Sequence, residues 1–270
     1  MKKERIDVLL VNKGFFETRE KAKRSIMAGL VFVKDERVDK PGARVDVEAP
    51  LRVKGDTMPY VSRGGLKLEK AIKSFHLDFK EKKVLDIGAS TGGFTDCAIQ
   101  HGADFVYSCD VGYNQLAWSL RNHEKVEVME RMNFRYAVKD DFKKGTPDIA
   151  VADVSFISLK WIVPPLYSIL AENGEAMLLV KPQFEAGRTK VGKKGIVRDP
   201  AVHLEVLENT TSMAAAAGFT CRNVSYSPIT GGEGNIEFLL YLQKGSHPES
   251  ELSKDALPQI VDEAHASFSS

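Results

Sequence analysis

The chain lacks the features that would assign it to a membrane or to an oxidising compartment. None of its apolar runs approaches the roughly 20 residues that a membrane-spanning helix needs. The basic start, residues 1–5, is not followed by the apolar stretch of a secretory signal. There are only three cysteines, Cys97, Cys109 and Cys221, and no Cys-x-x-Cys pair. We therefore expect reduced thiols in a cytoplasmic protein that binds no metal and no membrane.

The chain also lacks an excess of charge of either sign, since 38 basic and 37 acidic residues leave a net charge of +1. The charge is nevertheless uneven along the chain. Residues 1–83 hold 21 Lys or Arg and 13 Asp or Glu, whereas residues 245–270 hold one Lys and five acids. A basic N-terminal part favours an anionic partner, with nucleic acid first. A basic surface that is merely solvated is the alternative.

The most informative segment reads VLDIGASTGGFTD and spans residues 84–96. A short apolar run ends in Asp86, a loop of small residues follows, and a helical pattern then begins. This order of strand, tight turn and helix is typical of nucleotide-binding sites at the carboxyl edge of a parallel sheet. Three loop glycines, Gly88, Gly92 and Gly93, can let the backbone approach a ligand because they lack a Cβ atom.

A second apolar run, Phe105–Cys109, ends in Asp110, which could accept hydrogen bonds from ribose hydroxyls. A dinucleotide site needs the pattern G-x-G-x-x-G, but here Ser90 stands in place of the second glycine. Asp86, just before the loop, would repel a pyrophosphate and suits a cationic ligand. We therefore expect S-adenosylmethionine, which carries a sulfonium and no phosphate. An ordinary turn between strand and helix is the alternative without a ligand.

Seven apolar runs that resemble strands alternate with helical patterns from residue 84 onward. They are Val84–Ile87, Phe105–Cys109, Val126–Glu130, Ile149–Val154, Ala176–Val180, Cys221–Ser225 and Ile236–Leu242. This alternation predicts an α/β fold, a doubly wound, Rossmann-like sheet of seven strands. Only the loop Pro228–Asn235 separates the last two runs, which is too short for a parallel crossover. The last strand is therefore expected to be antiparallel. A helix over Gly65–Phe75 should precede the sheet.

The first 60 residues have the pattern of a smaller α+β domain. Helices are expected over residues 5–13 and 19–28, the second capped by Thr18, with strands at residues 30–33 and 45–47 and a turn at residues 34–37. Residues 50–62 are predicted to be a linker and residues 63–244 the larger domain. Residues 245–270 are expected to form an acidic, flexible tail, with a short helix from Leu257 as the alternative.

Charged residues mark the ends of several predicted strands. Asp153 and Lys181 each follow an apolar run, Glu237 interrupts one, and Lys67 precedes the sheet. Ligands bind at the carboxyl ends of strands in such sheets, and a buried lysine is costly unless it is paired. Singly, Lys67 could be a solvated helix residue, Asp153 a helix cap and Glu237 an exposed residue of an edge strand. Together they predict a site with two amines and two carboxylates.

The N-terminal pattern resembles the S-four-like RNA-binding module of ribosomal proteins and pseudouridine synthases. The matching residues are Arg5, Asp7, Leu9, Gly14, Thr18, Arg19, Ala22, Ile26, Gly29, Val31, Val33, Val38, Pro41 and Val45. The resemblance implies contacts with backbone phosphates, which position RNA without reading its sequence. The RNA-binding residues that we expect are Arg5, Arg19, Lys23, Arg24 and Lys34 in this module and Arg63, which follows it.

Four longer segments resemble the TlyA family, whose members join this module to an FtsJ-like domain. They read SRGGLKL at residues 62–68, DIGASTGGFTD at 86–96, DVSFISL at 153–159 and KPQFE at 181–185. The resemblance covers residues 1–244 and implies methylation of ribose 2′-hydroxyls, on cytidines of ribosomal RNA, with S-adenosylmethionine as the cofactor. It also implies a catalytic tetrad, Lys67, Asp153, Lys181 and Glu237. The implied cofactor-binding residues are Asp86, Gly88, Ala89, Ser90, Gly92, Gly93, Asp110, Val111 and Asn133.

The chemistry of this transfer assigns a role to each member of the tetrad. A ribose hydroxyl is a poor nucleophile that must lose its proton as it attacks the methyl carbon. We expect Lys181 to be the base, Lys67 to supply positive charge, and Asp153 and Glu237 to orient the amines. No metal is needed, because the sulfonium is already an activated leaving group.

Three other functions stay open at this point. The chain could be an RNA-binding or ribosome-assembly factor that keeps a cofactor pocket without catalysing a reaction. It could be a membrane-active haemolysin, a label that members of the resembling family carry, or a nicotinamide dehydrogenase. The expected partners are ribosomal RNA or ribosomal subunits. The modified nucleotide and the oligomeric state are left open by the sequence, with a monomer as one possibility.

Overall fold

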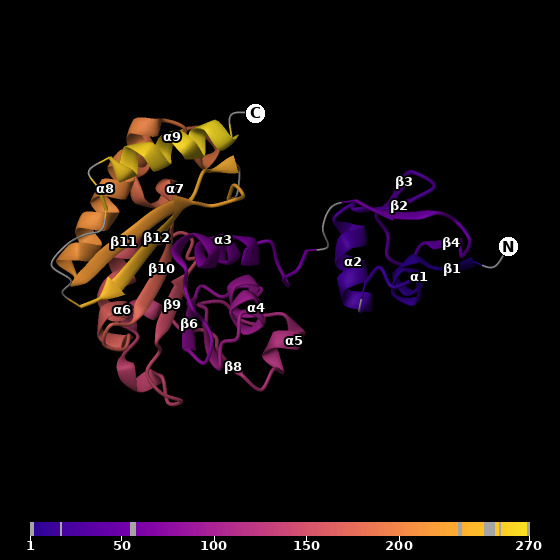
Figure 1. Cartoon of the computed structure of the whole chain (residues 1–270), viewed down its shortest axis with the longest axis horizontal. Helices are drawn as coiled ribbons and strands as arrows, with labels where there is room; N and C mark the ends of the chain where they lie inside the picture. Colours follow the sequence, from indigo (N-terminus) through magenta and orange to yellow (C-terminus); the bar gives the residue numbers. More distant parts are fainter. Residues whose placement is uncertain are drawn as a thin grey trace. The chain divides into compact units, whose positions relative to one another are not determined.

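The computed structural model describes residues 3–16, 18–54, 58–231, 234–245, 252–253 and 255–268. The chain divides into two compact units, Met1–Pro59 and Tyr60–Ser270, which are taken in turn below (Figure 1).

The N-terminal unit is a small α+β domain with a core of apolar side chains from both of its helices. Ile6 and Leu10 of α1 and Ile26 of α2 are fully buried in this core. Thr18 caps α2 by accepting a hydrogen bond from the backbone N–H of Lys21. Strand β1 pairs with β4, and the second sheet has the order β3-β2-β5. The elements are β1 (Lys3–Arg5), α1 (Ile6–Asn12), α2 (Arg19–Met27), β2 (Val31–Val33), β3 (Glu36–Val38), β4 (Arg44–Asp46) and β5 (Leu51–Val53).

Two details of this unit differ from the expectation. The predicted linker 50–62 contains strand β5, which pairs antiparallel with β2. It forms a strand because Leu51 and Val53 face the core of the unit while Arg52 between them is exposed. The expected four-residue turn is only two residues long. Lys34 and Asp35 both have positive φ, 51° and 65°, which is the geometry of a tight hairpin turn.

The larger unit contains the seven-stranded α/β sheet that was predicted. Its order is β11-β12-β10-β9-β6-β7-β8. Strand β12 pairs antiparallel with both β10 and β11, whereas β6, β7, β8, β9 and β10 run parallel. The strands are β6 (Lys83–Ile87), β7 (Phe105–Cys109), β8 (Val126–Met129), β9 (Ile149–Ala152), β10 (Glu175–Val180), β11 (Phe219–Tyr226) and β12 (Phe238–Lys244).

Helices cover both faces of this sheet (Figure 1). Helices α3 (Gly65–Phe75) and α4 (Gly93–Gln100) pack on the face that carries Val84 and Val106. Helices α6 (Val163–Ile169), α8 (Pro200–Ala216) and α9 (Ala256–Phe268) pack on the opposite face. The short helices are α5 (Trp118–Arg121), α7 (Pro182–Glu185) and the 3₁₀ turns Phe134–Tyr136, Lys139–Asp141, Leu159–Trp161, Arg188–Lys190 and Lys193–Gly195. Among the described residues, no helix combines the length and apolarity that crossing a membrane requires.

The C-terminal segment contains the helix that was the alternative to a flexible tail. Residues 256–268 form helix α9, which packs against α8 and β11 (Figure 1). Val261 and Ala264 are buried, and Ser267 hydrogen-bonds Tyr226 of β11 at 2.8 Å. The segment is acidic overall, which favoured a flexible tail, but its apolar residues recur at helical spacing and pack on the core. They are Leu257, Ile260, Val261, Ala264 and Phe268. Residues 246–251 and 254 lie outside the described part of the chain.

A contact between the buried His203 of α8 and the half-buried His265 of α9 joins the two helices and makes the stability of the fold depend on pH. His203 Nδ1 lies 2.9 Å from His265 Nε2, and burial lowers the pKa of His203 to about 4. A histidine in an unfolded chain has a pKa of about 6.5. Between these two values the unfolded chain binds a proton that the folded chain does not, so stability falls as the pH drops from about 6.5 toward 4.

We expect urea denaturation at a series of pH values to show this decline in the free energy of unfolding. The variant His203→Leu should show a smaller decline over the same pH range, because the group that titrates is gone. An identical decline in both proteins would contradict the assignment to His203.

Candidate active site

Four charged side chains converge at the carboxyl edge of the sheet. Lys67 extends from α3, Asp153 follows β9, Lys181 follows β10, and Glu237 immediately precedes β12. These residues are up to 170 positions apart in sequence. They meet because the parallel strands β9 and β10 end at the same edge, the antiparallel β12 begins there, and α3 brings Lys67 to it. Glu237 was expected inside the last strand, but it stands just outside it.

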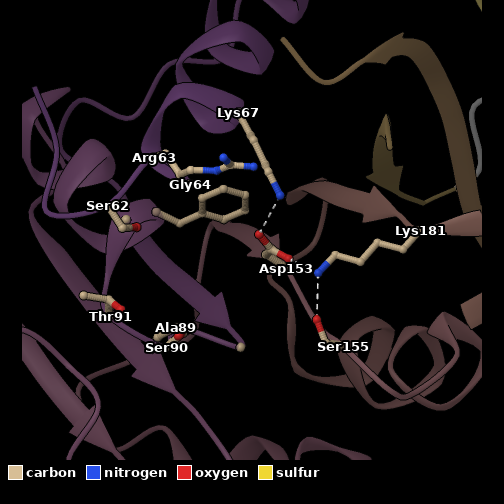
Figure 2. A pocket seen from close by; sticks show the side chains of 13 residues that line it. Ser62, Arg63, Gly64, Lys67, Ala89, Ser90, Thr91, Asp153, Ser155 and Lys181 are labelled. Carbon is tan, nitrogen blue, oxygen red and sulfur yellow. Dashed lines mark hydrogen bonds and ion pairs between the residues drawn. The ribbon is translucent and has the colours of Figure 1, made fainter. Parts of the chain in front are cut away.

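Ion pairs connect all four side chains in one chain of contacts. Lys67 Nζ lies 2.6 Å from Glu237 Oε2 and 3.4 Å from Asp153 Oδ2. Lys181 Nζ lies 2.5 Å from Asp153 Oδ1. Asp153 therefore bridges the two amines, as Figure 2 shows. The lysine side chains are only 9% exposed and that of Glu237 only 2%, so the alternatives of a solvated lysine and an exposed glutamate are wrong.

Burial and pairing oppose each other at Glu237. Burial raises the pKa of Glu237, while the Lys67 ammonium favours its charged form. A buried carboxylate is tolerated only with such a partner. The pair thus fixes the position of both side chains at the wall of the site.

A cavity of about 350 Å³ opens beside the tetrad (Figure 2). Lys67, Asp153 and Lys181 form one side of it. The other lining residues come from the segment before α3, from the loop after β6 with the start of α4, and from the segment after β9: Ser62, Arg63, Gly64, Gly88, Ala89, Ser90, Thr91, Gly93, Phe94 and Ser155. The glycine-rich loop and three members of the tetrad therefore border the same space.

The glycines of the loop stand where no side chain fits. Gly88 has φ +82°, and a Cβ there would lie 2.5 Å from the backbone oxygen of Asp153. A Cβ on Gly93 would lie 2.3 Å from Ser62 Oγ, and one on Gly92 would meet Leu120 at 2.4 Å. Gly88 and Gly93 line the cavity, whereas Gly92 packs against α5 and does not. Gly88 lets the loop pass close to Asp153 of the tetrad, and Gly93 lets the start of α4 pass close to the segment before α3.

Asp86 does not line the cavity, contrary to the expectation. It is fully buried beneath α4, where Oδ2 accepts a hydrogen bond of 2.7 Å from Thr95 Oγ1. Ser108 Oγ lies 2.7 Å from the same hydroxyl. Burial raises the pKa of Asp86 to about 7, and Oδ1 has no hydrogen-bond partner among the described residues.

The other predicted cofactor residues lie on the next two strand ends. Asp110 accepts hydrogen bonds of 2.7 Å from the backbone N–H groups of Ser90 and Gly112, which fixes its carboxylate against the glycine loop. Val111 beside it is 73% exposed. Asn133, after β8, lines a separate cavity of about 400 Å³. The predicted cofactor residues therefore do not share one cavity. The glycine loop lines the first cavity, Asn133 lines the second, and Asp110 and Val111 lie in the loop after β7.

These features fit S-adenosylmethionine. A glycine cradle that a Cβ would fill, an unpartnered carboxylate oxygen beneath it and a fixed Asp110 suit a cationic ligand with a ribose. The residues that would hold it are Gly88, Ala89 and Ser90 in the loop, with Asp110 and Asn133 at the following strand ends. Groups of His, Cys, Asp and Glu with the arrangement of a metal site do not occur in the described part of the chain.

The predicted RNA-binding residues divide between the two units. In the N-terminal unit Arg5 and Arg19 both pair with the buried Asp7, at 3.0 and 2.9 Å. Lys23 pairs with Glu20 at 2.8 Å, and Lys34 is exposed in its left-handed turn. In the larger unit Arg63 lines the cavity and donates a hydrogen bond to the backbone oxygen of Thr230. Arg24 lies in the last turn of α2.

The structure adds three functional contacts that sequence reasoning missed. Ser155 Oγ accepts a hydrogen bond of 2.9 Å from Lys181 Nζ. Asp7 holds both Arg5 and Arg19, and their guanidiniums keep the pKa of this carboxyl well below its usual range. Thr95 occupies one oxygen of Asp86. Asp7 and Ser155 both lie inside the segments that match the family. Each stands two positions after a predicted site residue, Arg5 or Asp153, and this spacing was the signal that could have identified them.

Comparison with known families agrees with this architecture. A sequence model of the FtsJ-like methyltransferase family matches residues 60–244, and one of the S4 domain matches residues 4–50. A solved structure from Streptococcus thermophilus, provisionally described as a hemolysin, superposes with a TM-score of 0.80 and 50% identity over 100% of this chain and 98% of that one.

Two curated relatives align along nearly their whole length. YqxC of Bacillus subtilis, provisionally named an rRNA methyltransferase, is 59% identical over 98% of this chain and 95% of its own. TlyA of Mycobacterium tuberculosis, named a 16S/23S rRNA (cytidine-2′-O)-methyltransferase, is 37% identical over 97% of both chains. With its S4 domain, its FtsJ-like domain and these relatives, the chain belongs to the TlyA family of methyltransferases.

Proposed function

We propose that this protein transfers a methyl group from S-adenosylmethionine to the 2′-hydroxyl of a cytidine ribose in ribosomal RNA. The observation that carries the proposal is that two buried amines and Asp153 line one cavity together with a glycine-rich loop, while Glu237 holds one of the amines from behind. The relatives named for this reaction support the choice of substrate. Because the substrate is ribosomal RNA, the protein acts in the cytoplasm, on ribosomal subunits or their RNA.

Each member of the tetrad has a distinct part in the reaction. When bound, S-adenosylmethionine supplies a methyl group on a sulfonium, which is already a good leaving group. Lys181, in its neutral form, takes up the proton of the ribose hydroxyl at Nζ. Asp153 holds that amine, and Lys67, fixed by Glu237, adds positive charge beside the oxygen that becomes nucleophilic. Positioning of the two substrates contributes most of the rate enhancement.

The test is to incubate the protein with S-adenosylmethionine and ribosomal subunits, digest the RNA, and analyse its nucleosides by mass spectrometry. We expect one added methyl on a cytidine ribose, and none when the cofactor is left out. RNA binding without any methyl transfer to intact subunits would instead favour a non-catalytic assembly factor. Digestion of each separated subunit's RNA to oligonucleotides instead of nucleosides, again with mass spectrometry, identifies the modified nucleotide and the subunit that carries it.

The S4 domain is expected to hold RNA by its phosphates. The variant Lys34→Gln removes an exposed cation from the hairpin turn, so affinity for ribosomal RNA should fall and the slope of log K against log salt should decrease by about one. Fluorescence anisotropy over a salt series measures both values.

Lys80→Gln is the matched control, because Lys80 is an exposed lysine of the larger unit in the loop before β6. Its salt slope should equal that of the parent protein. Equal slopes in all three proteins would mean that Lys34 contacts no phosphate.

A further inference from the structure

The amine of Lys181 has two protein partners that leave it one free direction. Asp153 Oδ1 lies 2.5 Å and Ser155 Oγ 2.9 Å from Lys181 Nζ. A tetrahedral amine bonded to Cε and held by two acceptors has one remaining position, which carries the third proton or, in the neutral form, the lone pair. Lys181, Asp153 and Ser155 all line the cavity, so the amine borders the space that a substrate hydroxyl would enter.

The segment that carries Ser155 is fastened to the segment that carries Lys181 by contacts outside the tetrad. Phe156 has φ +63°, an uncommon conformation for an aromatic residue, and its ring lies 5.1 Å from that of Phe184. Glu185 accepts hydrogen bonds from Ser158 Oγ at 2.6 Å and from the backbone N–H of Leu159 at 2.8 Å. Residues 153–159 and 181–185 therefore form one frame.

These contacts explain why the segments DVSFISL and KPQFE contain more than the two tetrad residues. In DVSFISL and KPQFE, Asp153 and Lys181 belong to the tetrad, whereas the serines, the phenylalanines and Glu185 join the two segments to each other. Burial raises the pKa of Glu185, because it disfavours the charged carboxylate, and the hydrogen bonds from Ser158 and Leu159 oppose this effect. A polar group that is buried in this way needs such partners. A backbone held in this way fixes the distance between Ser155 and Lys181.

We propose that Ser155 is a positioning residue that aims the Lys181 amine at the ribose hydroxyl. The proposal rests on the proposed function, in which Lys181 takes up the proton of that hydroxyl. With Asp153 alone, the amine could rotate about its ion pair and point its free position away from the substrate. The Ser155 hydroxyl removes this freedom, and it also stabilises the ammonium form by accepting a hydrogen bond from it.

The variant Ser155→Ala should lower kcat by about 10- to 100-fold, the range that one hydrogen bond to a charged group spans. The KM for RNA and the affinity for S-adenosylmethionine should stay at the parent values. Ser155→Thr keeps the hydroxyl and should restore most of kcat. Ser168→Ala, at an exposed serine of α6, is the matched control and should behave as the parent.

A kcat for Ser155→Ala within twofold of the parent would overturn the proposal. So would an equal loss in the Ala and Thr variants with weakened cofactor binding, since that result indicates a merely structural role.

A second measurement separates this proposal from the proposed function, because it needs neither RNA nor cofactor. In protein with ¹⁵N-labelled lysine side chains, NMR relaxation reports the mobility of the Lys181 ammonium. We expect restricted rotation in the parent and in Ser155→Thr, and faster rotation in Ser155→Ala. Unchanged mobility in Ser155→Ala would overturn the positioning role. If the mobility changes as expected but the parent transfers no methyl, the proposed function fails and the positioning role stands.

Discussion

Replacing Lys181 by alanine is expected to reduce methyl transfer by about 10²- to 10⁴-fold, the usual contribution of a general base. The fold should survive the change, because Asp153 keeps Lys67 as a partner at 3.4 Å and no carboxylate is left without a counter-ion. Cofactor affinity, measured by calorimetry, should be unchanged. The assay is transfer of a labelled methyl group to ribosomal subunits under single-turnover conditions, which reports the chemical step.

A second substitution at the same position separates a base from a simple positive charge. Lys181→Arg keeps the charge, but a guanidinium does not give up its proton in proteins. We therefore expect the arginine variant to be as inactive as the alanine variant. Substantial transfer by Lys181→Arg would mean that the residue acts by its charge alone and that the base lies elsewhere. Full activity of Lys181→Ala would exclude Lys181 from the chemistry altogether.

Replacing Gly88 by alanine is expected to damage cofactor binding and catalysis together. The new Cβ would lie 2.5 Å from the backbone oxygen of Asp153, so the loop or the segment after β9 must move. Asp153 bridges both amines of the tetrad, and a displacement of about 1 Å at a reacting group can cost about 10²-fold in rate. We expect at least such a loss of transfer, with weaker binding of S-adenosylmethionine in calorimetry.

Gly102→Ala is the matched control for this substitution. Gly102 has φ +92°, so alanine there suffers the same backbone strain as at Gly88, but the nearest atom is Lys80 Cα at 3.5 Å, an ordinary contact. It precedes β7, at the amino end of the sheet. Gly102→Ala should lose about 1–2 kcal/mol of stability and keep cofactor affinity and kcat. If both variants lost cofactor binding alike, strain alone, and not the contact with Asp153, would explain the effect at Gly88.

The positions of the tetrad could be predicted because they depend on topology. Once apolar runs and helices alternate, parallel strands must end at one edge, and the residues after those runs, Asp153 and Lys181, must lie there. The short loop before β12 fixed its antiparallel direction in the same way and brought Glu237 to that edge. Which carboxylate each lysine contacts could not be predicted, since Lys67 and Glu237 are 170 residues apart and meet only through packing.

The predictions that differed from the structure share a cause. Asp86 was placed in the cavity from its position in the motif, but alternation along β6 turns its side chain toward α4 and Thr95. The linker and the tail were predicted from their polar composition, although β5 and α9 each present an apolar face with the period of their element. Composition counts the residues of both faces of an element, whereas only the residues of one face need to be apolar for the element to pack on a core.

By itself the sequence determined the succession of strands in the seven-stranded sheet, the direction of its last strand and the edge at which the charged residues gather. These follow from the periodicity of apolar residues and from loop length, which are local properties of the chain. Only the tertiary structure decided that Asp153 bridges both lysines, that Ser155 holds Lys181 and that Asp86 is buried under α4. Such contacts depend on side-chain directions set by close packing between segments that are distant in sequence.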